Sequence, residues 1–139
     1  MRHALTLIEI MVVVAILGML AAALSLGLTG KLAQANSSIA ELQIREIANH
    51  LDLYRQSQRQ LPAASEGLAV LTTPSCTPDA VYFLEPAKLR DPWGQPFQYL
   101  VPGPQGLPFE VVSYGADGVP GGEGEKADIS SAALSLGQE

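Results

Sequence analysis

The sequence is poor in the residues from which most small catalytic and metal sites are built. Its 139 residues include one cysteine and two histidines. A single cysteine, Cys76, cannot form an internal disulfide, and without a Cys/His cluster a structural zinc site is excluded. His50 has no obvious nucleophile in register, and the Gly-x-Ser-x-Gly, P-loop and His-Glu-x-x-His motifs do not occur. The sequence therefore does not predict an enzyme.

Basic residues are also few. The chain has 8 Lys and Arg residues against 14 Asp and Glu residues, a net charge of −6, and no basic cluster. Nucleic acids and anionic lipid surfaces attract clustered positive charge, so we expect neither as a partner. From Lys31 onward there are 7 basic and 13 acidic residues, so all of the net negative charge lies in this part.

Charge is missing altogether from residues 10–30. As a helix, these 21 residues would measure about 32 Å, which matches the roughly 30 Å of a bilayer core. Since no proline occurs before Pro62, we expect one continuous helix over residues 5–58. Gly27 and Gly30 are its weak points, where bending or local melting in water is expected.

The rest of the chain changes from helical to strand-like patterns. A short helix is expected at 66–72, strands are expected at 97–101 and 109–114, and a third short strand would complete a small sheet. Such a sheet needs a cover, and the second half of the long helix carries an apolar stripe at steps of three and four. The stripe consists of Ala40, Ile44, Ile47, Ala48, Leu51 and Tyr54. The pattern predicts an α+β fold in which a long N-terminal α-helix, membrane-spanning in its first half and amphipathic in its second, packs on a small C-terminal antiparallel β-sheet.

The apolar block at the N-terminus has two ordinary interpretations. It is either a secretory signal peptide cut after Ala23 or an uncleaved single-span anchor. Both interpretations must explain Glu9, because a carboxylate at the mouth of a membrane segment costs a few kcal/mol unless it is paired.

The run from Leu5 to Ala22 offers a third interpretation. It reads Leu-Thr-Leu-Ile-Glu-Ile-Met-Val-Val-Val-Ala-Ile-Leu-Gly-Met-Leu-Ala-Ala, which resembles the class III signal of type IV pilins and type II secretion pseudopilins. The resemblance implies that a prepilin peptidase cuts between Ala4 and Leu5 and methylates the amine of Leu5. It makes Glu9 an assembly residue, whose carboxylate pairs with the α-amino group of a neighbouring subunit. The chain departs from the family in having Ala4 instead of glycine, and Leu5 instead of phenylalanine.

A second motif is an acidic, glycine-rich segment over residues 113–129. Hard cations such as Ca²⁺ bind carboxylate and carbonyl oxygens in flexible loops, although a solvated acidic turn has the same composition. An EF-hand is not predicted, because Val119 and Gly121 stand where that loop needs side-chain oxygens.

The same segment resembles the calcium-binding loop of the major pseudopilins of type II secretion. The resemblance implies a Ca²⁺ ion held by the side chains of Asp117 and Asp128 and by the carbonyl oxygens of Tyr114 and Val119. Further candidate ligands are Glu123, Glu125 and Ser113.

A third motif is the turn Asp91-Pro92-Trp93-Gly94. Asp before Pro initiates a turn, Gly94 allows a positive φ, and Trp93 is expected to anchor the sheet to the helix. Pro92, Trp93 and Gly94 are therefore taken as structural residues. The motif is similar to the Asp-Pro-Trp-Gly of pseudopilins, and with the other two motifs it extends the resemblance over most of residues 5–129.

The resemblance implies a complete arrangement of the chain and its partners. Residues 1–4 are a leader, residues 5–30 a transmembrane and fibre-core helix, and residues 31–139 a periplasmic domain. The protein would reside in the bacterial inner membrane as a single-pass protein and polymerise into a helical pseudopilus that drives protein export. Its partners would be copies of itself, minor pseudopilins, prepilin peptidase, and an inner-membrane assembly platform with its ATPase. A type IV or competence pilin, a minor pseudopilin, and a secreted calcium-binding module released by signal peptidase remain as alternatives.

Overall fold

The computed structural model describes residues 6–73 and 83–136, and for residues 24–30 and Leu136 it describes the backbone only. The chain divides into two compact units, Met1–Gln34 and Ala35–Glu139. Cys76 and the expected cleavage site between Ala4 and Leu5 lie outside the described residues.

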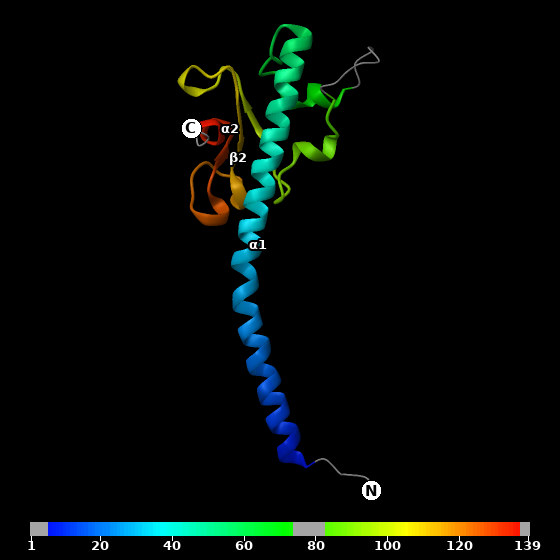
Figure 1. The fold of residues 1–139 in the computed structure, drawn as a ribbon, viewed down its shortest axis with the longest axis vertical. Helices are drawn as coiled ribbons and strands as arrows, with labels where there is room; N and C mark the ends of the chain where they lie inside the picture. Colours follow the sequence, from blue (N-terminus) through cyan, green and yellow to red (C-terminus); the bar gives the residue numbers. More distant parts are fainter. Residues whose placement is uncertain (1–5, 74–82, 137–139) are drawn as a thin grey trace. The chain divides into compact units, whose positions relative to one another are not determined.

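One long helix, α1, runs over Leu7–Gln58 (Figure 1). It ends where Arg59 takes a left-handed conformation, with φ of 59°, and where Pro62 prevents a further helical turn. The continuous helix expected from the sequence is confirmed. The local melting expected at Gly27 and Gly30 is not found, because two separated glycines cost only about 2 kcal/mol together and the long helix on both sides overcomes this cost.

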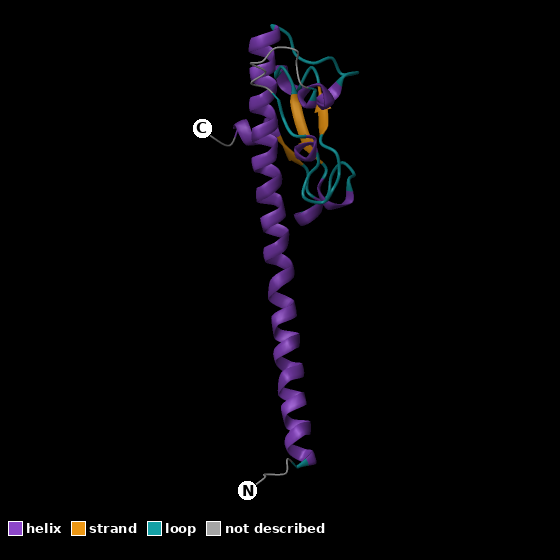
Figure 2. Cartoon of the chain, turned by 90° about the vertical axis from the view of Figure 1, so that its right-hand side faces the viewer, coloured by secondary structure: helices purple, strands orange, loops and turns teal. Residues whose placement is uncertain are grey.

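A three-stranded antiparallel sheet follows in the C-terminal unit. Its strands are β1 (Gln98–Leu100), β2 (Glu110–Ser113) and β3 (Ile129–Ser130), and β2 lies in the middle. Tyr99 of β1 pairs with Val111 of β2, and Ser113 of β2 pairs with Ile129 of β3. The two expected strands and the short third strand are therefore present. Figure 2 shows the sheet along one side of the C-terminal half of α1.

Short helices connect these elements. The segment expected to form a helix at 66–72 is a 3₁₀-helix over Gly67–Thr72, and further 3₁₀ turns occupy Pro86–Leu89, Pro104–Gly106, Gly115–Asp117 and Gly124–Lys126. A six-residue helix, α2 (Ser131–Leu136), follows β3 and was not predicted.

Two serines hold helix α2 in place. Ser130 caps it by accepting the backbone N–H of Ala132 at 3.0 Å. The Ser131 hydroxyl accepts the backbone N–H of Val111 at 3.0 Å, which ties α2 to β2.

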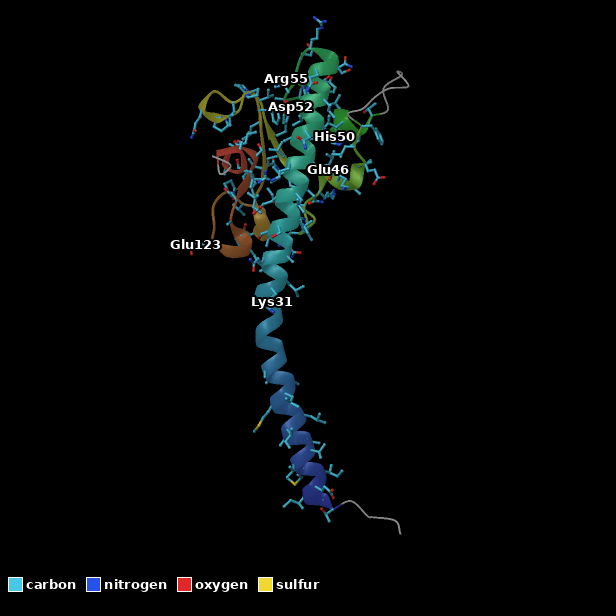
Figure 3. All side chains as sticks on the ribbon, viewed as in Figure 1. Lys31, Glu46, His50, Asp52, Arg55 and Glu123 are labelled. Atoms are coloured by element: carbon cyan, nitrogen blue, oxygen red, sulfur yellow. The ribbon has the colours of Figure 1, made fainter. Side chains whose placement is uncertain are left out.

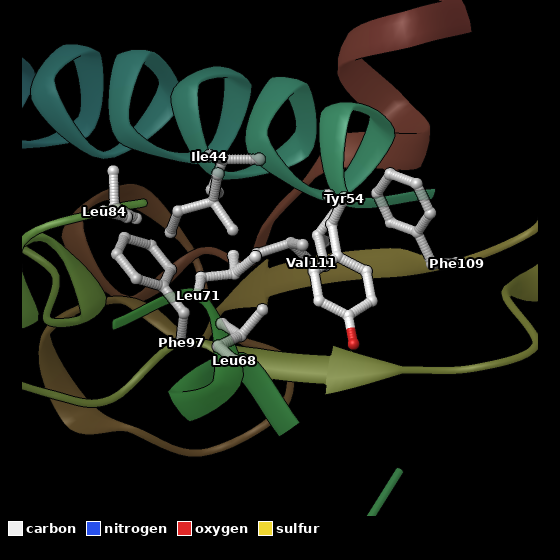
Figure 4. Close-up of a cluster of buried hydrophobic side chains, with 10 residues drawn as sticks. Ile44, Tyr54, Leu68, Leu71, Leu84, Phe97, Phe109 and Val111 are labelled. Carbon is white, nitrogen blue, oxygen red and sulfur yellow. The ribbon is translucent and has the colours of Figure 1, made fainter. Parts of the chain in front are cut away.

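The hydrophobic core lies between α1 and the sheet (Figure 4). The predicted stripe on α1 is buried, with Ile44, Ile47 and Leu51 wholly inaccessible to solvent and Ala48 packed at the margin. These side chains meet residues from the 3₁₀-helices, the sheet and the segments beside it. The opposing side chains are Leu68, Leu71, Leu84, Phe97, Phe109 and Val111. Each fully buried aliphatic side chain contributes about 1.5–3 kcal/mol of transfer free energy, so the stripe is what attaches the sheet to the helix.

Candidate functional site

Glu9 lies in the first turn of helix α1, where its local environment suits a carboxylate. The backbone N–H of Glu9 donates to the carbonyl oxygen of Thr6 at 3.1 Å and to its hydroxyl at 3.4 Å. Thr6 is the N-cap residue and Glu9 the third residue of the helix, which is the spacing of a capping box. A negative charge is also favoured at a helix N-terminus. Any test of an assembly role for Glu9 must therefore preserve this capping arrangement.

The N-terminal part of α1 is apolar around its whole circumference. Over the positions between Leu7 and Leu20, large apolar side chains keep between 47% and 79% of their surface exposed. They are Leu7, Ile8, Ile10, Met11, Val12, Val13, Val14, Ile16, Leu17, Met19 and Leu20. A helix that is apolar on every side is stable only when lipid or other protein covers it.

In the part of the chain that the structure describes, no helix carries an apolar stretch long enough to cross a membrane. The expected span of residues 5–30 includes Leu5 and the side chains of residues 24–30, which lie outside that part.

The acidic segment after β2 folds back on itself, and the backbone of its first half packs directly against the backbone of its second half. Gly115 has φ of +64°, and a Cβ there would lie 2.6 Å from the carbonyl oxygen of Glu125. Gly122 has φ of +104°, and its Cβ would lie 2.6 Å from the carbonyl oxygen of Lys126. Only glycine satisfies both the conformation and the space at these two positions. The two halves of the loop therefore approach more closely than side chains would permit.

Asp117 and Asp128, the two carboxylates expected to bind Ca²⁺, both turn onto the loop backbone. Asp117 Oδ1 accepts the N–H of Val119 at 3.4 Å, and Asp128 Oδ2 accepts the N–H of Gly121 at 2.9 Å. Both residues are exposed, so their remaining oxygens have access to solvent.

The other candidate ligands are placed differently. Glu123 and Glu125 are exposed, and Figure 3 shows Glu123 at the outer margin of the loop. Ser113 is wholly buried, and its hydroxyl donates to Asp91 Oδ2 at 2.6 Å. Among the described residues, no group of three or more His, Cys, Asp and Glu side chains comes together at a spacing that would hold a metal ion. The structure thus ties two of the four predicted carboxylates, those of Asp117 and Asp128, to the loop backbone by hydrogen bonds.

Asp91, predicted from the sequence only to initiate a turn, is a buried carboxylate. Its Oδ1 accepts the backbone N–H groups of Trp93 at 3.1 Å and Gln95 at 2.8 Å, while Oδ2 accepts the Ser113 hydroxyl. The side chain of Gln95 in turn lies against Gly118. The Asp-Pro-Trp-Gly turn and the acidic loop are therefore one connected structure. The spacing of the motifs in the sequence, 22 residues from Asp91 to Ser113, gave no sign of this contact.

The other residues of the turn behave partly as expected. Gly94 has the expected positive φ of 86°, and its carbonyl accepts Arg90 Nη1 at 2.8 Å. Pro92, which follows Asp91 in the sequence, is half-buried. Trp93 is half-buried too, lies outside the core cluster, and has a buried indole N–H with no hydrogen-bond partner among the described residues.

Two known families match the chain, one at its N-terminus and one over most of the remainder. A family model for the type II secretion system, protein G, matches residues 27–132, and a model for the prokaryotic N-terminal methylation motif matches residues 1–25. The chain is 41% identical over 131 residues to the type II secretion system core protein G of Pseudomonas aeruginosa, covering 91% of this chain and 92% of the relative. It is 38% identical over 130 residues to the core protein G of Vibrio cholerae, covering 91% of this chain and 88% of that relative.

A solved structure supports the same relationship. The crystal structure of the major pseudopilin from the type 2 secretion system of enterohaemorrhagic Escherichia coli superposes with a TM-score of 0.60 at 26% identity. The superposition covers 77% of this chain and 95% of that one.

Proposed function

The chain belongs to the protein G family of type II secretion systems and is a major pseudopilin, and we propose that its copies polymerise through their N-terminal helices into the periplasmic pseudopilus that drives protein export. The family is structural and not enzymatic, and membership implies a place at the inner membrane and periplasm among the secretion machinery. The proposed order of events is insertion, processing and assembly. Residues 5–30 first lie in the inner membrane, with residues 31–139 in the periplasm. Prepilin peptidase then cuts between Ala4 and Leu5 and methylates Leu5.

The observation that carries this proposal is the apolar circumference of the N-terminal helix. Exposed side chains such as Leu7, Ile8 and Met19, each more than 70% accessible, have no cover within the described chain. Lipid covers them before assembly, and the same helices of other copies cover them in the fibre. Subunits related by a screw operation form an open-ended helical filament, because the same contact repeats from each copy to the next and never closes into a ring. An assembly platform, its ATPase and minor pseudopilins act on this process.

Glu9 supplies the charge that assembly needs. A mature chain begins with the α-amino group of Leu5, a positive charge that is costly in lipid or in a fibre core unless it is paired. We assign Glu9 of a neighbouring copy as its partner. The pairing neutralises two charges at once, so it favours the assembled state over isolated subunits.

The test of assembly uses Glu9→Gln in the full-length protein. Glutamine keeps the capping-box hydrogen-bonding capacity and removes the charge, so helix α1 still forms and inserts. We expect normal amounts of processed protein in the membrane and at least a tenfold loss of fibres, seen by electron microscopy and by chemical cross-linking. Wild-type levels of fibres in this variant would refute the charge pair.

Mass spectrometry of the mature N-terminus separates the proposal from its alternatives. A methylated Leu5 supports processing as a pseudopilin. A chain that starts at Leu24 is the product of signal peptidase and would identify a secreted module instead.

We also propose that the acidic loop binds Ca²⁺ and that the bound ion stabilises the C-terminal unit. Its donor set fits a hard cation, since Asp117 and Asp128 turn their carboxylates onto a loop that contains no Cys or His. Carbonyl oxygens of Tyr114 and Val119 would complete the ligands, with Glu123 and Glu125 available from outside. Ser113 is left out, because its hydroxyl is committed to Asp91. When bound, the ion would link the two ends of the loop, which are 11 positions apart in the sequence.

A further inference from the structure

Gln95 joins the Asp-Pro-Trp-Gly turn to the acidic loop at a point inside the loop. A Cβ atom placed on Gly118 would lie 3.1 Å from Gln95 Cδ, 3.3 Å from Oε1 and 3.4 Å from Nε2. Three distances this similar, with the amide carbon nearest, mean that the flat face of the amide covers Gly118. Because Gly118 has no side chain, the amide of Gln95 lies against the loop backbone itself.

Gly118 lies between two of the predicted Ca²⁺ ligands, the side chain of Asp117 and the carbonyl oxygen of Val119. It has φ of +65°, and its N–H donates to the carbonyl oxygen of Gly115 at 3.4 Å. Glycine adopts left-handed and right-handed conformations with similar ease, so this residue does not select its own conformation. A rotation at Gly118 would turn the two predicted ligands relative to each other. A contact from outside the loop that holds Gly118 therefore also holds its two neighbours.

Gln95 is itself held firmly by the turn. Its N–H donates to Asp91 Oδ1 at 2.8 Å, and its carbonyl oxygen accepts the N–H of Asp91 at 2.9 Å. The Asp91 side chain is buried and accepts the Ser113 hydroxyl at the end of β2. The backbone of Gln95 is thus fixed relative to the sheet, and its half-buried side chain reaches the loop from a rigid base.

The same turn also holds the start of the loop. The Ser113 hydroxyl that donates to Asp91 accepts the N–H of Gly115 at 3.3 Å. Tyr114, whose carbonyl oxygen is a predicted ligand, lies between these two residues. The turn therefore acts on the direct neighbours of three predicted ligands, all in the first half of the loop.

We propose that Gln95 is a positioning residue of the Ca²⁺ site, which holds Asp117 and Val119 in the arrangement that binds the ion without contacting the ion itself. This inference rests on the proposed Ca²⁺ site and adds a residue from outside the loop to it. Groups that orient metal ligands typically contribute 10- to 100-fold to metal affinity. Without Gln95, part of the binding free energy would be spent on ordering the loop.

The test compares Gln95→Ala with Gln98→Ala in the full-length protein in detergent. Gln98 is also half-buried, and its amide donates to the carbonyl oxygen of Pro96 at 3.4 Å. Competition with a calcium-binding dye gives the Ca²⁺ affinity of each protein. We expect about tenfold weaker binding in Gln95→Ala and wild-type affinity in Gln98→Ala. In excess chelator, Gln95→Ala should melt at the wild-type temperature, since its role concerns the bound state.

Gln95→Met distinguishes a positioning residue from a ligand. Methionine has a similar length and packs adaptably, so it keeps a contact with Gly118, but it offers no oxygen to the ion. We expect Gln95→Met to bind Ca²⁺ with nearly wild-type affinity. A loss as large as that of Gln95→Ala would make the amide oxygen a ligand and overturn the positioning role.

The remaining outcomes separate this inference from the Ca²⁺ site on which it rests. Wild-type affinity in Gln95→Ala overturns the inference and leaves the site intact. A lower melting temperature of Gln95→Ala in excess chelator would make Gln95 a residue of the fold, and this also overturns the inference. A wild-type protein that does not compete with the dye for Ca²⁺ overturns the site itself.

Discussion

Ser113 donates a 2.6 Å hydrogen bond to Asp91 Oδ2, and both residues are buried. Ser113 is the last residue of β2, from which the acidic loop departs, and Asp91 opens the Asp-Pro-Trp-Gly turn. The contact fixes the position from which the loop begins. The contact also joins the Asp-Pro-Trp-Gly turn to the acidic loop, although the two motifs are far apart in the sequence. Together they hold the loop in a defined place.

Removal of the Asp91 carboxylate is expected to destabilise the C-terminal unit. In Asp91→Ala, three donors lose their acceptor, namely the amides of Trp93 and Gln95 and the hydroxyl of Ser113. A buried donor without a partner costs about 1–3 kcal/mol, and the Ser113 hydroxyl is buried while the two amides are partly buried, so we expect a loss of about 3 kcal/mol in the free energy of unfolding. Denaturant unfolding followed by fluorescence of Trp93, the one tryptophan in the chain, measures it.

Ser113→Ala is the matched control for this measurement. It deletes the Ser113 bond to Asp91 and the bond that the hydroxyl accepts from the Gly115 N–H at 3.3 Å, and it leaves both amides bound to Asp91. At about 1 kcal/mol for each hydrogen bond, the loss is expected to be about 2 kcal/mol. Equal losses in the two variants would show that the amide bonds of the turn contribute nothing.

Calcium is expected to raise the melting temperature of the wild-type protein relative to excess chelator, because a ligand that binds only the folded state stabilises it. Asp117→Asn and Asp128→Asn should each abolish the increase, while Glu123→Gln, at the outer margin of the loop, should retain most of it. Calorimetry with and without calcium makes the comparison. If the wild type melts at the same temperature in both conditions, the loop is only a turn.

Alkaline pH is expected to weaken the fold through Tyr99. Burial, together with the nearby Tyr54, raises the pKa of the Tyr99 hydroxyl from 10.0 to about 12. The hydroxyl also donates to the carbonyl oxygen of Pro62 at 3.0 Å. Since the folded state holds this proton more tightly than the unfolded state, the resulting stabilisation is complete below pH 10 and is lost as the pH rises toward about 12.

Tyr99→Phe separates this contribution from the general effect of alkali. The variant should be less stable than the wild type at neutral pH, because it lacks the hydrogen bond to Pro62. Its stability should fall less steeply between pH 10 and pH 12, as measured by urea midpoints. Parallel profiles for the two proteins would assign the alkaline transition to other groups.

The elements that the sequence predicts well are those set by local spacing. Ile44, Ile47 and Leu51 lie on one face of any α-helix, so their burial follows from periodicity alone. The strand pair around Tyr99 and Val111 is similarly local, since a short loop joins the two strands. These predictions required no knowledge of the rest of the chain.

The elements that the sequence missed depend on contacts between distant segments. The bond between Asp91 and Ser113 arises only when the sheet brings the turn and β2 together. Helix α2 has too few residues for a periodic pattern, and it depends on Ser130 and Ser131 for its cap and its attachment. All four acidic loop residues are exposed, and composition does not reveal that Asp117 and Asp128 accept N–H groups of the loop backbone.

The close backbone approach in the acidic loop has a consequence for how its sequence is able to vary. The shape of the loop is held at Gly115 and Gly122, where side chains are absent, and by the carboxylates of Asp117 and Asp128, which accept loop N–H groups. Exposed residues such as Val119 and Glu123 are therefore free to change between relatives without loss of the loop's form. A saturation library over the loop would tolerate many residues at those positions and none but glycine at the two closing points.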